Sequence, residues 1–500
     1  MKLRPFLHAL EKITCSVTGN VSGEILHITM DSREVKPRSL FCAIRGSNTD
    51  GHKYLDIAVQ KGAVCCVISG DSSWQAPDPD FPVVRVSDSY FAWGILCETF
   101  LGKPADSLQL FAVTGTNGKT TVTWLLRSIL RNAFPDRKCG LITTVEYNTG
   151  GDTLPEESSR TTPESMDLQK LFARMKEENC TYAVMEQSSH GLHQFRAGTT
   201  LYAGAVFTNL TGDHLDYHGD MEHYFQAKKL LFTRMLRRDA PAVILIDNPW
   251  GERLFEELKK ENRNVCGVTL CAHPSADAVV DGIRTTLEGS DFTIHFEGES
   301  IPFHIPLCGK YNICNAAEAL LLAWKKGIPI DILQKAAAGF QAPPGRLEKF
   351  FLPRKGAYAF VDYAHTDDAL CQVLQTLSGL GGKRIITVFG CGGDRDRTKR
   401  PRMAQAASGY SHEVILTHDN PRNEDPARIL NDIIQGFPAG YRFRIVEDRK
   451  EAIETALNAA GEADMVLIAG KGHENYQLVR GVKNHFDDRE AVLQYLEKNI

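Results

Sequence analysis

The segment GTNGKTT, residues 115–121, contains the residue types that bind the phosphates of a nucleotide. Its two glycines allow the backbone to fold closely around an anion, Lys119 supplies a positive charge, and the Thr120 hydroxyl can ligate Mg²⁺. The regular phosphate-loop motif would also have a glycine at position 113, where this chain has valine. The alternative is therefore an ordinary glycine-rich turn with a solvated lysine.

The residues on either side of this segment favour phosphate binding. Residues 111–113 are predicted to end a buried strand, and residues 121–130 to form an amphipathic helix, with Trp124, Leu125 and Ile129 at helical spacing. The N-terminus of a helix that follows such a loop points backbone N–H groups at an anion. A nucleotide triphosphate is thus the expected ligand.

Polar side chains that suit a metal ion follow other strands predicted in the same region. These strands span residues 141–143, 182–187, 204–210 and 242–247. Open parallel sheets bind ligands at the carboxyl ends of their strands, so Glu186 and His214 should lie near the phosphates and are candidate Mg²⁺ ligands. The alternative for Glu186 is a helix N-cap partner. Lys228 and Lys229 lie in the polar-rich stretch 208–232, and spacing does not decide which is nearer the phosphates.

Residues beyond a hinge or linker at 343–345 repeat the pattern of strand, polar residues and helix. Four units, each a strand followed by polar residues, are predicted at residues 357–365, 384–390, 413–420 and 465–472. Arg395 and Arg422 each follow a strand and could bind one carboxylate together, and Glu474 could accept an ammonium group. This combination suggests a pocket for a zwitterionic amino acid. The alternative is that the basic run at 395–402 is a solvated surface.

The composition is that of a globular protein with several domains. Five hundred residues suggest about three domains of ~100–200 residues each. We predict an α/β fold with a first domain at residues 1–106, a central parallel-sheet domain with the phosphate loop at 107–341, and a Rossmann-like domain at 342–500. A net charge of −5 gives no reason to expect nucleic-acid or membrane binding. Thirteen cysteines without a C-x-x-C pair indicate reduced thiols in a cytoplasmic protein.

An ordered set of segments resembles the Mur ligase family, and within it the enzymes that add diaminopimelate. The segments cover nearly the whole chain, and such a set is far more specific than any one of its motifs. They include GTNGKTT, TTPES (161–165), MEQSSHGL (185–192), residues 207–228, GKYNICNAAEAL (309–320), PGRLE (344–348), VDYAHT (361–366), residues 392–403, DNPR (419–422) and AGKGHE (469–474).

The resemblance implies a reaction that the three domains would serve. They would bind a UDP-sugar, ATP and an incoming amino acid. ATP would phosphorylate the free D-glutamate carboxylate of UDP-N-acetylmuramoyl-L-alanyl-D-glutamate, and the amine of meso-2,6-diaminopimelate would attack the acyl phosphate, in peptidoglycan precursor synthesis. Phosphorylation is needed because a carboxylate is a poor electrophile, and the rest of the work is positioning and charge neutralisation. The resemblance also implies Mg²⁺ as cofactor and ATP as co-substrate, and we expect a cytoplasmic monomer.

The resemblance also implies the site residues. Those expected at ATP are Gly115, Thr116, Asn117, Gly118, Lys119, Thr120, Thr121, Asn312, Asn315, Arg346 and Asp362. Those expected at the UDP-linked substrate are Met30, Ser32, Ser47, Asn48, Thr49, Thr161, Thr162, Ser188, Gln194 and Arg196. Those expected at diaminopimelate are Arg395, Asp419, Asn420, Pro421, Arg422, Gly470 and Glu474. The expected metal ligands are Thr120, Glu186, His214 and Lys228, the last as a carbamate (N6-carboxylysine), and the expected catalytic residues are Lys119, Lys228, His214 and Glu186.

Arg422 favours diaminopimelate over L-lysine, the nearest competing acceptor. Diaminopimelate is lysine with one more carboxylate, and the resemblance implies that relatives adding lysine lack this arginine. A buried guanidinium left without its carboxylate is costly, which discriminates against lysine. The chain departs from the common family pattern at Gln187, Phe195 and Asp367, which bears on the fit of the dipeptide substrate.

Three further functions are compatible with parts of the sequence. A folylpolyglutamate synthetase-like ligase would share the architecture, but DNPR and the full run at 207–228 are not expected in it. A phosphate-loop ATPase or kinase would explain the glycine-rich loop and leave the arginines near the C-terminus without a role. A non-enzymatic nucleotide-binding module would need neither the metal ligands nor the amino-acid pocket.

Overall fold

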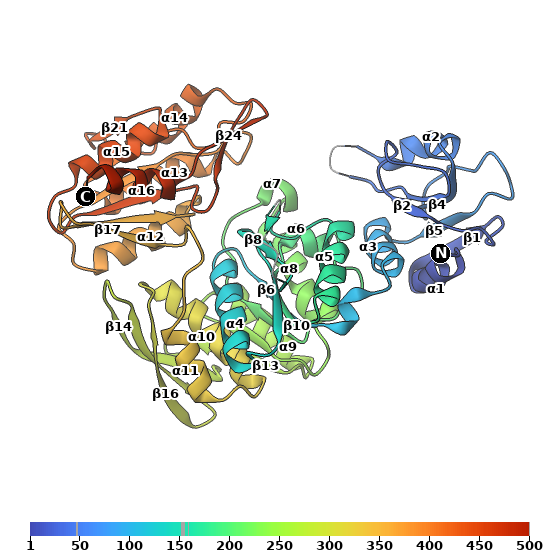
Figure 1. The fold of residues 1–500 in the computed structure, drawn as a ribbon, viewed down its shortest axis with the longest axis horizontal. Coiled ribbons are helices and arrows are strands. Elements are labelled where there is room, and N and C mark those ends of the chain that lie inside the picture. Colours follow the sequence, from blue (N-terminus) through green and yellow to red (C-terminus); the bar gives the residue numbers. More distant parts are fainter. Residues whose placement is uncertain (47–48, 152–155, 159, 500) are drawn as a thin grey trace. The chain divides into compact units, whose positions relative to one another are not determined.

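The computed structural model describes residues 1–46, 49–151, 156–158 and 160–499 (Figure 1). The chain forms two compact units and passes between them several times. Unit 1 comprises Met1–Thr114, Pro135–Ala205 and Gln226–Ala240, and unit 2 comprises Gly115–Phe134, Val206–Phe225 and Pro241–Ile500. The predicted α/β class is confirmed in both units. The predicted domain limits at 106/107 and 341/342 stay predictions.

The first sheet of unit 1 has the strand order β1-β5-β4-β3-β2. Strands β2 to β5 are parallel, and β1 is antiparallel to β5. The strands are apolar because helices cover both faces: α1 and α3 pack on one face and α2 on the other. The bounds are α1 Arg4–Leu10, β1 Thr14–Thr18, β2 His27–Thr29, β3 Ser39–Cys42, α2 Leu55–Gln60, β4 Ala63–Ser69, β5 Val83–Val86 and α3 Ser89–Phe100.

A second group of parallel strands in unit 1 has the order β6-β10-β7, with β8 antiparallel to β7. The predicted strands at 141–143 and 182–187 correspond to β7 and β10. The register places Glu186, the last residue of β10, opposite Val113, two residues before the glycine-rich loop. The bounds are β6 Gln109–Thr114, β7 Lys138–Ile142, β8 Glu146–Asn148, α5 Ser165–Glu177, β10 Cys180–Glu186 and α6 Ser189–His193.

Unit 2 begins with the glycine-rich loop and helix α4, which confirms the helix predicted at 121–130. Helix α4 buries Leu125, Leu126 and Ile129 and packs against α10. Strands β12, β13 and β14 are parallel, and β15 and β16 continue the sheet in antiparallel order. Strands β13 to β16 were not among the predicted strands, and in β15 and most of β16 the side chains alternate between more buried and more exposed positions. The bounds are α4 Lys119–Ala133, β12 Ala242–Leu245, β13 Val265–Thr269, β14 Ala278–Thr285, β15 Ser290–Phe296, β16 Glu299–Ile305 and α10 Lys310–Lys325.

The C-terminal part of unit 2 is a three-layer α/β sandwich, as predicted (Figure 1). Its sheet has the order β17-β18-β22-β19-β20-β21, with only β17 antiparallel to its neighbour among the described strands. Helices α12, α13 and α14 cover one face, and α15 and α16 cover the other. The four predicted strands correspond to β18, β19, β20 and β22, which end before the polar residues that follow them.

The remaining bounds in this part are β17 Glu348–Leu352, β18 Ala357–Asp362, α12 Asp367–Gly379, β19 Ile385–Phe389, α13 Lys399–Tyr410, β20 Glu413–Leu416, α14 Pro426–Ile434, β21 Phe443–Ile445, α15 Arg449–Ala459, β22 Met465–Ala469, β23 Tyr476–Val479, β24 Val482–His485 and α16 Asp488–Lys498. Across the described residues, no helix combines the length and the apolar character needed to span a bilayer.

Candidate active site

The glycine-rich loop adopts a conformation that only glycine accommodates at two positions. Gly115 and Gly118 have φ values of 150° and 85°. A Cβ atom would lie 1.9 Å from Thr208 Oγ1 at the first position and 2.2 Å from Asn315 Oδ1 at the second. Glycine is therefore needed at both positions, because φ is positive and neighbouring side chains approach closely.

The segment after strand β11 (Gly204–Phe207) holds this loop from one side. The backbone N–H groups of Thr116 and Asn117 donate to Asn209, at 2.9 Å to its carbonyl oxygen and 2.9 Å to its side-chain Oδ1. Thr208 Oγ1 in turn donates to the Asn117 carbonyl at 2.5 Å. The loop backbone is thus fixed before any ligand arrives, and the first N–H groups of α4 follow directly.

Positive charge gathers where α4 begins. Lys119 Nζ donates to the carbonyl oxygens of Gly115 and Thr116, at 3.1 and 2.8 Å. Arg346 Nη2 donates to Thr120 Oγ1 at 3.0 Å, and its guanidinium lies 4.6 Å from the centroid of the Tyr363 ring. Lysine, arginine and a helix N-terminus together suit a polyphosphate.

The other residues expected at ATP lie around this loop in unit 2. Asn315 contacts Gly118, and Asn312 Nδ2 donates to the Cys308 carbonyl at 2.8 Å. The Asp362 carboxylate accepts from the backbone N–H groups of Leu347 and Ala364, each at 2.7 Å, and burial raises its pKa. Asp362 therefore holds the backbone next to Arg346, so the structure brings the whole expected ATP set together within one unit.

Glu186 is a buried carboxylate at the end of β10, as predicted. Its two carboxylate oxygens accept from the backbone N–H and the hydroxyl of Thr144, at 3.0 and 3.1 Å. Thr144 Oγ1 also lies 3.1 Å from the Thr161 hydroxyl, within hydrogen-bond distance. The N-cap alternative is not needed, because Ser188 caps α6 by accepting from Gly191 N at 3.0 Å. Thr144 is a site residue that sequence reasoning missed, although it directly follows a predicted strand.

The oxygen ligands that Mg²⁺ prefers are present among the expected metal residues. Thr120 and His214 belong to unit 2, and Glu186 and Lys228 belong to unit 1. No group of three or more His, Cys, Asp or Glu side chains among the described residues could hold a metal alone. The Glu186 carboxylate and the Thr120 hydroxyl are each oxygen ligands of the kind that Mg²⁺ prefers, and Mg²⁺ usually keeps waters in its shell as well.

His214 lies on an exposed loop in a left-handed backbone conformation with φ 55°. Its Nε2 is 3.5 Å from Asp213 Oδ2. Burial by itself would raise the pKa of Asp213, but positive charge at His214 and Lys399 lowers it. Asp213 therefore stays ionised beside the His214 imidazole, and His214 is exposed on unit 2.

The two candidate lysines on helix α8 (Met221–Leu230) differ in burial. Lys228 is 1% exposed, whereas Lys229 is half-buried. A lysine so deeply buried carries a large desolvation penalty as an ammonium ion. Burial therefore distinguishes the two lysines, and Lys228 is the one enclosed within unit 1.

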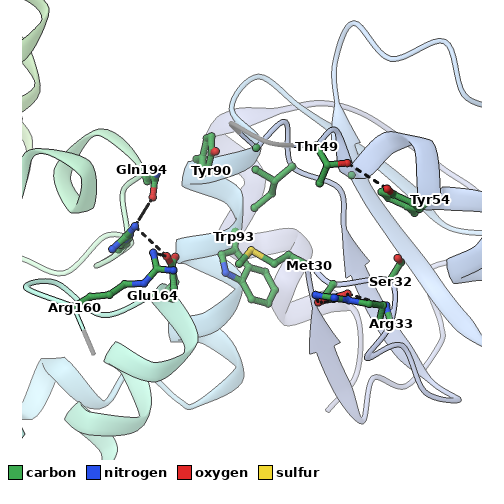
Figure 2. Close-up of a pocket in the computed structure, with 16 residues that line it drawn as sticks. Met30, Ser32, Arg33, Thr49, Tyr54, Tyr90, Trp93, Arg160, Glu164 and Gln194 are labelled. Carbon is green, nitrogen blue, oxygen red and sulfur yellow. Dashed lines mark hydrogen bonds and ion pairs between the residues drawn. The ribbon is translucent and has the colours of Figure 1, made fainter. Parts of the chain in front are cut away.

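Five of the residues expected at the UDP-linked substrate line one pocket of unit 1, with a volume of about 570 Å³ (Figure 2). They are Met30, Ser32, Thr49, Gln194 and Arg196. Ser47 and Asn48 lie outside the described residues. Sequence reasoning missed several further lining residues, because nothing in the local sequence links α3 to this place and only Thr161 and Thr162 were expected from residues 160–164. The missed residues include Tyr54, Tyr90, Trp93, Arg160 and Glu164.

Arg196 is the most constrained cation of this pocket. It is 5% exposed and donates to the Thr162 carbonyl at 2.6 Å and to Gln194 Oε1 at 2.8 and 3.0 Å. Its Nη2 is 3.0 Å from Glu164 Oε1, which also pairs with Arg160. The guanidinium is therefore held in one orientation, as recognition of an anionic ligand requires.

The remaining residues of this expected set connect the pocket to Glu186. Thr162 Oγ1 donates to the Glu186 carbonyl at 3.0 Å and accepts from Ser188 N at 2.9 Å. Thr161 joins the carboxylate of Glu186 through Thr144. Within unit 1, one hydrogen-bonded network thus runs from Arg196 to the buried carboxylate.

The residues expected at diaminopimelate gather at the carboxyl ends of β20 and β22. Asn420 Nδ2 donates to Glu474 Oε2 at 2.8 Å, and buried Lys471 lies 3.3 Å from the same oxygen. A Cβ on Gly470 would lie 2.8 Å from Asp419 Oδ2. Burial raises the pKa of Glu474, although Lys471 opposes the shift. The group combines acceptors with one internal cation, which suits an ammonium-bearing ligand.

The Arg422 guanidinium donates a hydrogen bond to a neutral carbonyl group. Its Nη1 donates to the Gly393 carbonyl at 2.8 Å, and its backbone has φ 53°. Over the part of the chain that the structure describes, Arg422 forms no ion pair. Arg395 is exposed, and its neighbour Asp394 accepts from Asn423 N and Nδ2 at 3.1 Å. The two loops that carry the arginines therefore lie side by side.

The interpretation of the basic run as a solvated surface is wrong for Arg400. Its side chain is fully buried and pairs with Glu424 at 2.7 Å and Asp432 at 2.8 Å. This pairing lowers the pKa of Glu424 to about 2. Arg397 pairs with Asp432, and Arg402 pairs with Asp367 at 3.1 Å. The last contact uses one of the positions where the chain departs from the family pattern.

Three family models match consecutive parts of the chain. The Mur ligase family catalytic domain matches residues 24–89, the Mur ligase middle domain matches 113–323, and the Mur ligase glutamate ligase domain matches 345–472. Each match falls inside one of the three predicted domains.

Relatives match along their full length. A UDP-N-acetylmuramoyl-L-alanyl-D-glutamate–2,6-diaminopimelate ligase from Clostridium tetani is 37% identical over 501 residues, covering 100% of both chains. The protein of the same name from Gloeobacter violaceus is 40% identical over 493 residues, covering 98% of each. A solved structure with this name has a TM-score of 0.68 and 31% identity, and covers 100% of this chain and 99% of the other. The chain belongs to the Mur ligase family.

The fit of Gly118 against Asn315 gives a first test of the phosphate loop. Gly118→Ala should weaken ATP binding by at least about tenfold, because a Cβ there meets Asn315 and a left-handed residue costs about 1–2 kcal/mol. Titration calorimetry with an ATP analogue measures the loss. Gly23→Ala, at a site with open space around it, is the control and should bind ATP as wild type does. Equal affinities of both variants would contradict the assignment.

Proposed function

We propose that this chain is an ATP-dependent ligase that adds meso-2,6-diaminopimelate to UDP-N-acetylmuramoyl-L-alanyl-D-glutamate through an acyl phosphate. The relatives that match along their whole length carry the name of this ligase. The observation that supports the acceptor best is Arg422, whose guanidinium bonds a carbonyl and no carboxylate of the described chain. A second carboxylate on the substrate would give this guanidinium an ionic partner, and lysine has no second carboxylate.

The phosphate loop and its neighbours would do the activating step. Lys119 would contact the transferred phosphate, Arg346 would hold Thr120 in place, and the N–H groups at the start of α4 would bind phosphate oxygens. When bound, Mg²⁺ would neutralise charge on those oxygens, with Thr120, Glu186 and His214 as its expected protein ligands. A Lys228 carbamate would help to hold a second ion.

The pocket in unit 1 would bind the UDP-linked dipeptide. Met30, Ser32 and Thr49 line one side of it, where the uridine end is expected, and Gln194, to which Arg196 donates, lines the other. The network from Arg196 through Thr162 leads toward Glu186, as expected if the D-glutamate end points to the phosphates. The proposal includes a cytoplasmic location and a monomeric state.

Phosphate release with a panel of amino acids tests the function directly. With ATP, Mg²⁺ and UDP-N-acetylmuramoyl-L-alanyl-D-glutamate, we expect release to depend on meso-diaminopimelate and to be at least about 100-fold less efficient with L-lysine. Mass spectrometry of the product would show one added diaminopimelate residue. Efficient turnover with L-lysine alone would identify L-lysine, and not diaminopimelate, as the acceptor. Turnover with a folate substrate instead of the UDP-dipeptide would overturn the proposed function.

Removing the Arg422 guanidinium should impair the use of diaminopimelate and leave the KM for ATP nearly unchanged. Arg422→Ala should lower kcat/KM for diaminopimelate by about 100-fold, since a charge-assisted contact to the extra carboxylate is lost. The KM for ATP should stay within twofold of wild type. Arg442→Ala, at an exposed arginine of the same region, is the matched control and should turn over normally. Unchanged use of diaminopimelate by Arg422→Ala would remove this residue from the pocket.

The buried lysine of α8 gives a separate test of the carbamate. Lys228→Ala should lose most activity, and added acetate or formate should restore part of it by supplying an oxygen anion. Lys229→Ala should keep its activity because that side chain is only half-buried. Steady-state phosphate release with and without added carboxylate measures the rescue. Full activity of Lys228→Ala would exclude a carbamate.

A further inference from the structure

Helix α3 contacts the core of the first sheet with one face and the substrate pocket with another, and Trp93 belongs to both. Ala92 and Leu96 are buried in the core beneath the sheet. Tyr90 and Trp93, three residues apart on one side of the helix, line the pocket. In Figure 2 these two aromatic residues lie between Met30 and Ser32 on one side and Gln194 and Glu164 on the other. The helix therefore stands between the two walls of the pocket.

A third face of α3 contacts the turn that carries Gln194 and Arg196. Phe91, Gly94 and Glu98 recur at positions i, i+3 and i+7, so they form one stripe. A Cβ on Gly94 would lie 2.4 Å from the Phe195 carbonyl oxygen, so the two backbones touch. Glu98 Oε2 and Oε1 accept from Thr199 N and Oγ1, at 2.9 and 2.5 Å.

Phe195 is held in a backbone conformation that favours glycine. Its φ is 48°, which costs a residue with a Cβ about 1–2 kcal/mol. The residue is 8% exposed, and its ring centroid lies 4.8 Å from that of Phe91. The Arg234 guanidinium lies 5.9 Å from the same ring. The packing of the ring on α3 offsets the strained backbone, so the turn between Gln194 and Arg196 is fixed to the helix.

We propose that this contact between α3 and residues 195–199 is a brace that sets the spacing of the two pocket walls. Gly94, Glu98 and Phe195 are thereby positioning residues for a long ligand that uses both walls, and this inference rests on the proposed UDP-linked substrate. A ligand that bridges two walls gains affinity only if their separation is fixed beforehand. A fragment that occupies one wall does not depend on that separation.

Comparing the affinities for the whole ligand and for its nucleotide fragment distinguishes loss of the brace from a general loss of structure. Gly94→Ala forces α3 and the turn apart, and should weaken UDP-N-acetylmuramoyl-L-alanyl-D-glutamate by at least about tenfold. UDP itself should bind within twofold of wild type. Titration calorimetry on the full chain measures both affinities. Gly409→Ala, at an exposed glycine of helix α13 with open space around it, is the matched control and should leave both unchanged.

A second variant tests the brace without a steric clash. Phe195→Gly keeps the left-handed turn at no backbone cost and removes only the ring, so it should fold and raise the KM for the UDP-dipeptide several-fold. Its kcat and its KM for ATP should stay within twofold of wild type. Unchanged affinity for the UDP-dipeptide in both variants, or equal losses for UDP and the UDP-dipeptide, would overturn the brace. Failure of the wild-type chain to bind the UDP-dipeptide at all would instead overturn the proposed function.

Discussion

The pairing of the phosphate loop with the segment after β11 is the constraint on which the nucleotide end of the site depends. Asn209 accepts from two consecutive backbone N–H groups of the loop, and Thr208 returns a bond to the loop's carbonyl. This arrangement leaves no room for a side chain at Gly115, and Asn315 of α10 leaves none at Gly118. It also fixes the direction in which α4 begins, and with it the positive end of the helix. A loop of this kind tolerates a valine at position 113, because its shape comes from the neighbouring segment.

The fold could be predicted where both faces of a sheet are covered. In the C-terminal sheet, helices pack on both sides, so β18, β19, β20 and β22 are largely continuous apolar runs followed by polar loop residues. Strands β15 and β16 could not be recognised in this way, since one of their faces is partly exposed and carries His295 and His304.

The candidate site could be predicted where its chemistry is local. The glycine-rich loop, Glu186 at a strand end and Arg422 in its turn are each visible within a few residues of sequence. Thr144 and Trp93 were missed because their roles come from partners distant in the chain. The same reason applies to Arg400, which lies in a basic run but is buried between Glu424 and Asp432. Sequence shows which charges are present, and only the fold shows which of them neutralise one another.

That distinction explains why the acceptor choice can reside in one arginine. Arg400 and Arg449 are buried with carboxylates of the protein, and Lys471 is buried beside Glu474. Such internal pairs are strongly held, and breaking one would leave an uncompensated charge in the protein. The Arg422 side chain donates to a carbonyl oxygen among its described partners, so a substrate carboxylate could match its charge at small cost. On the proposed function, discrimination between two amino acids that differ by one carboxylate would then depend largely on this residue, while the phosphate loop would act identically in either reaction.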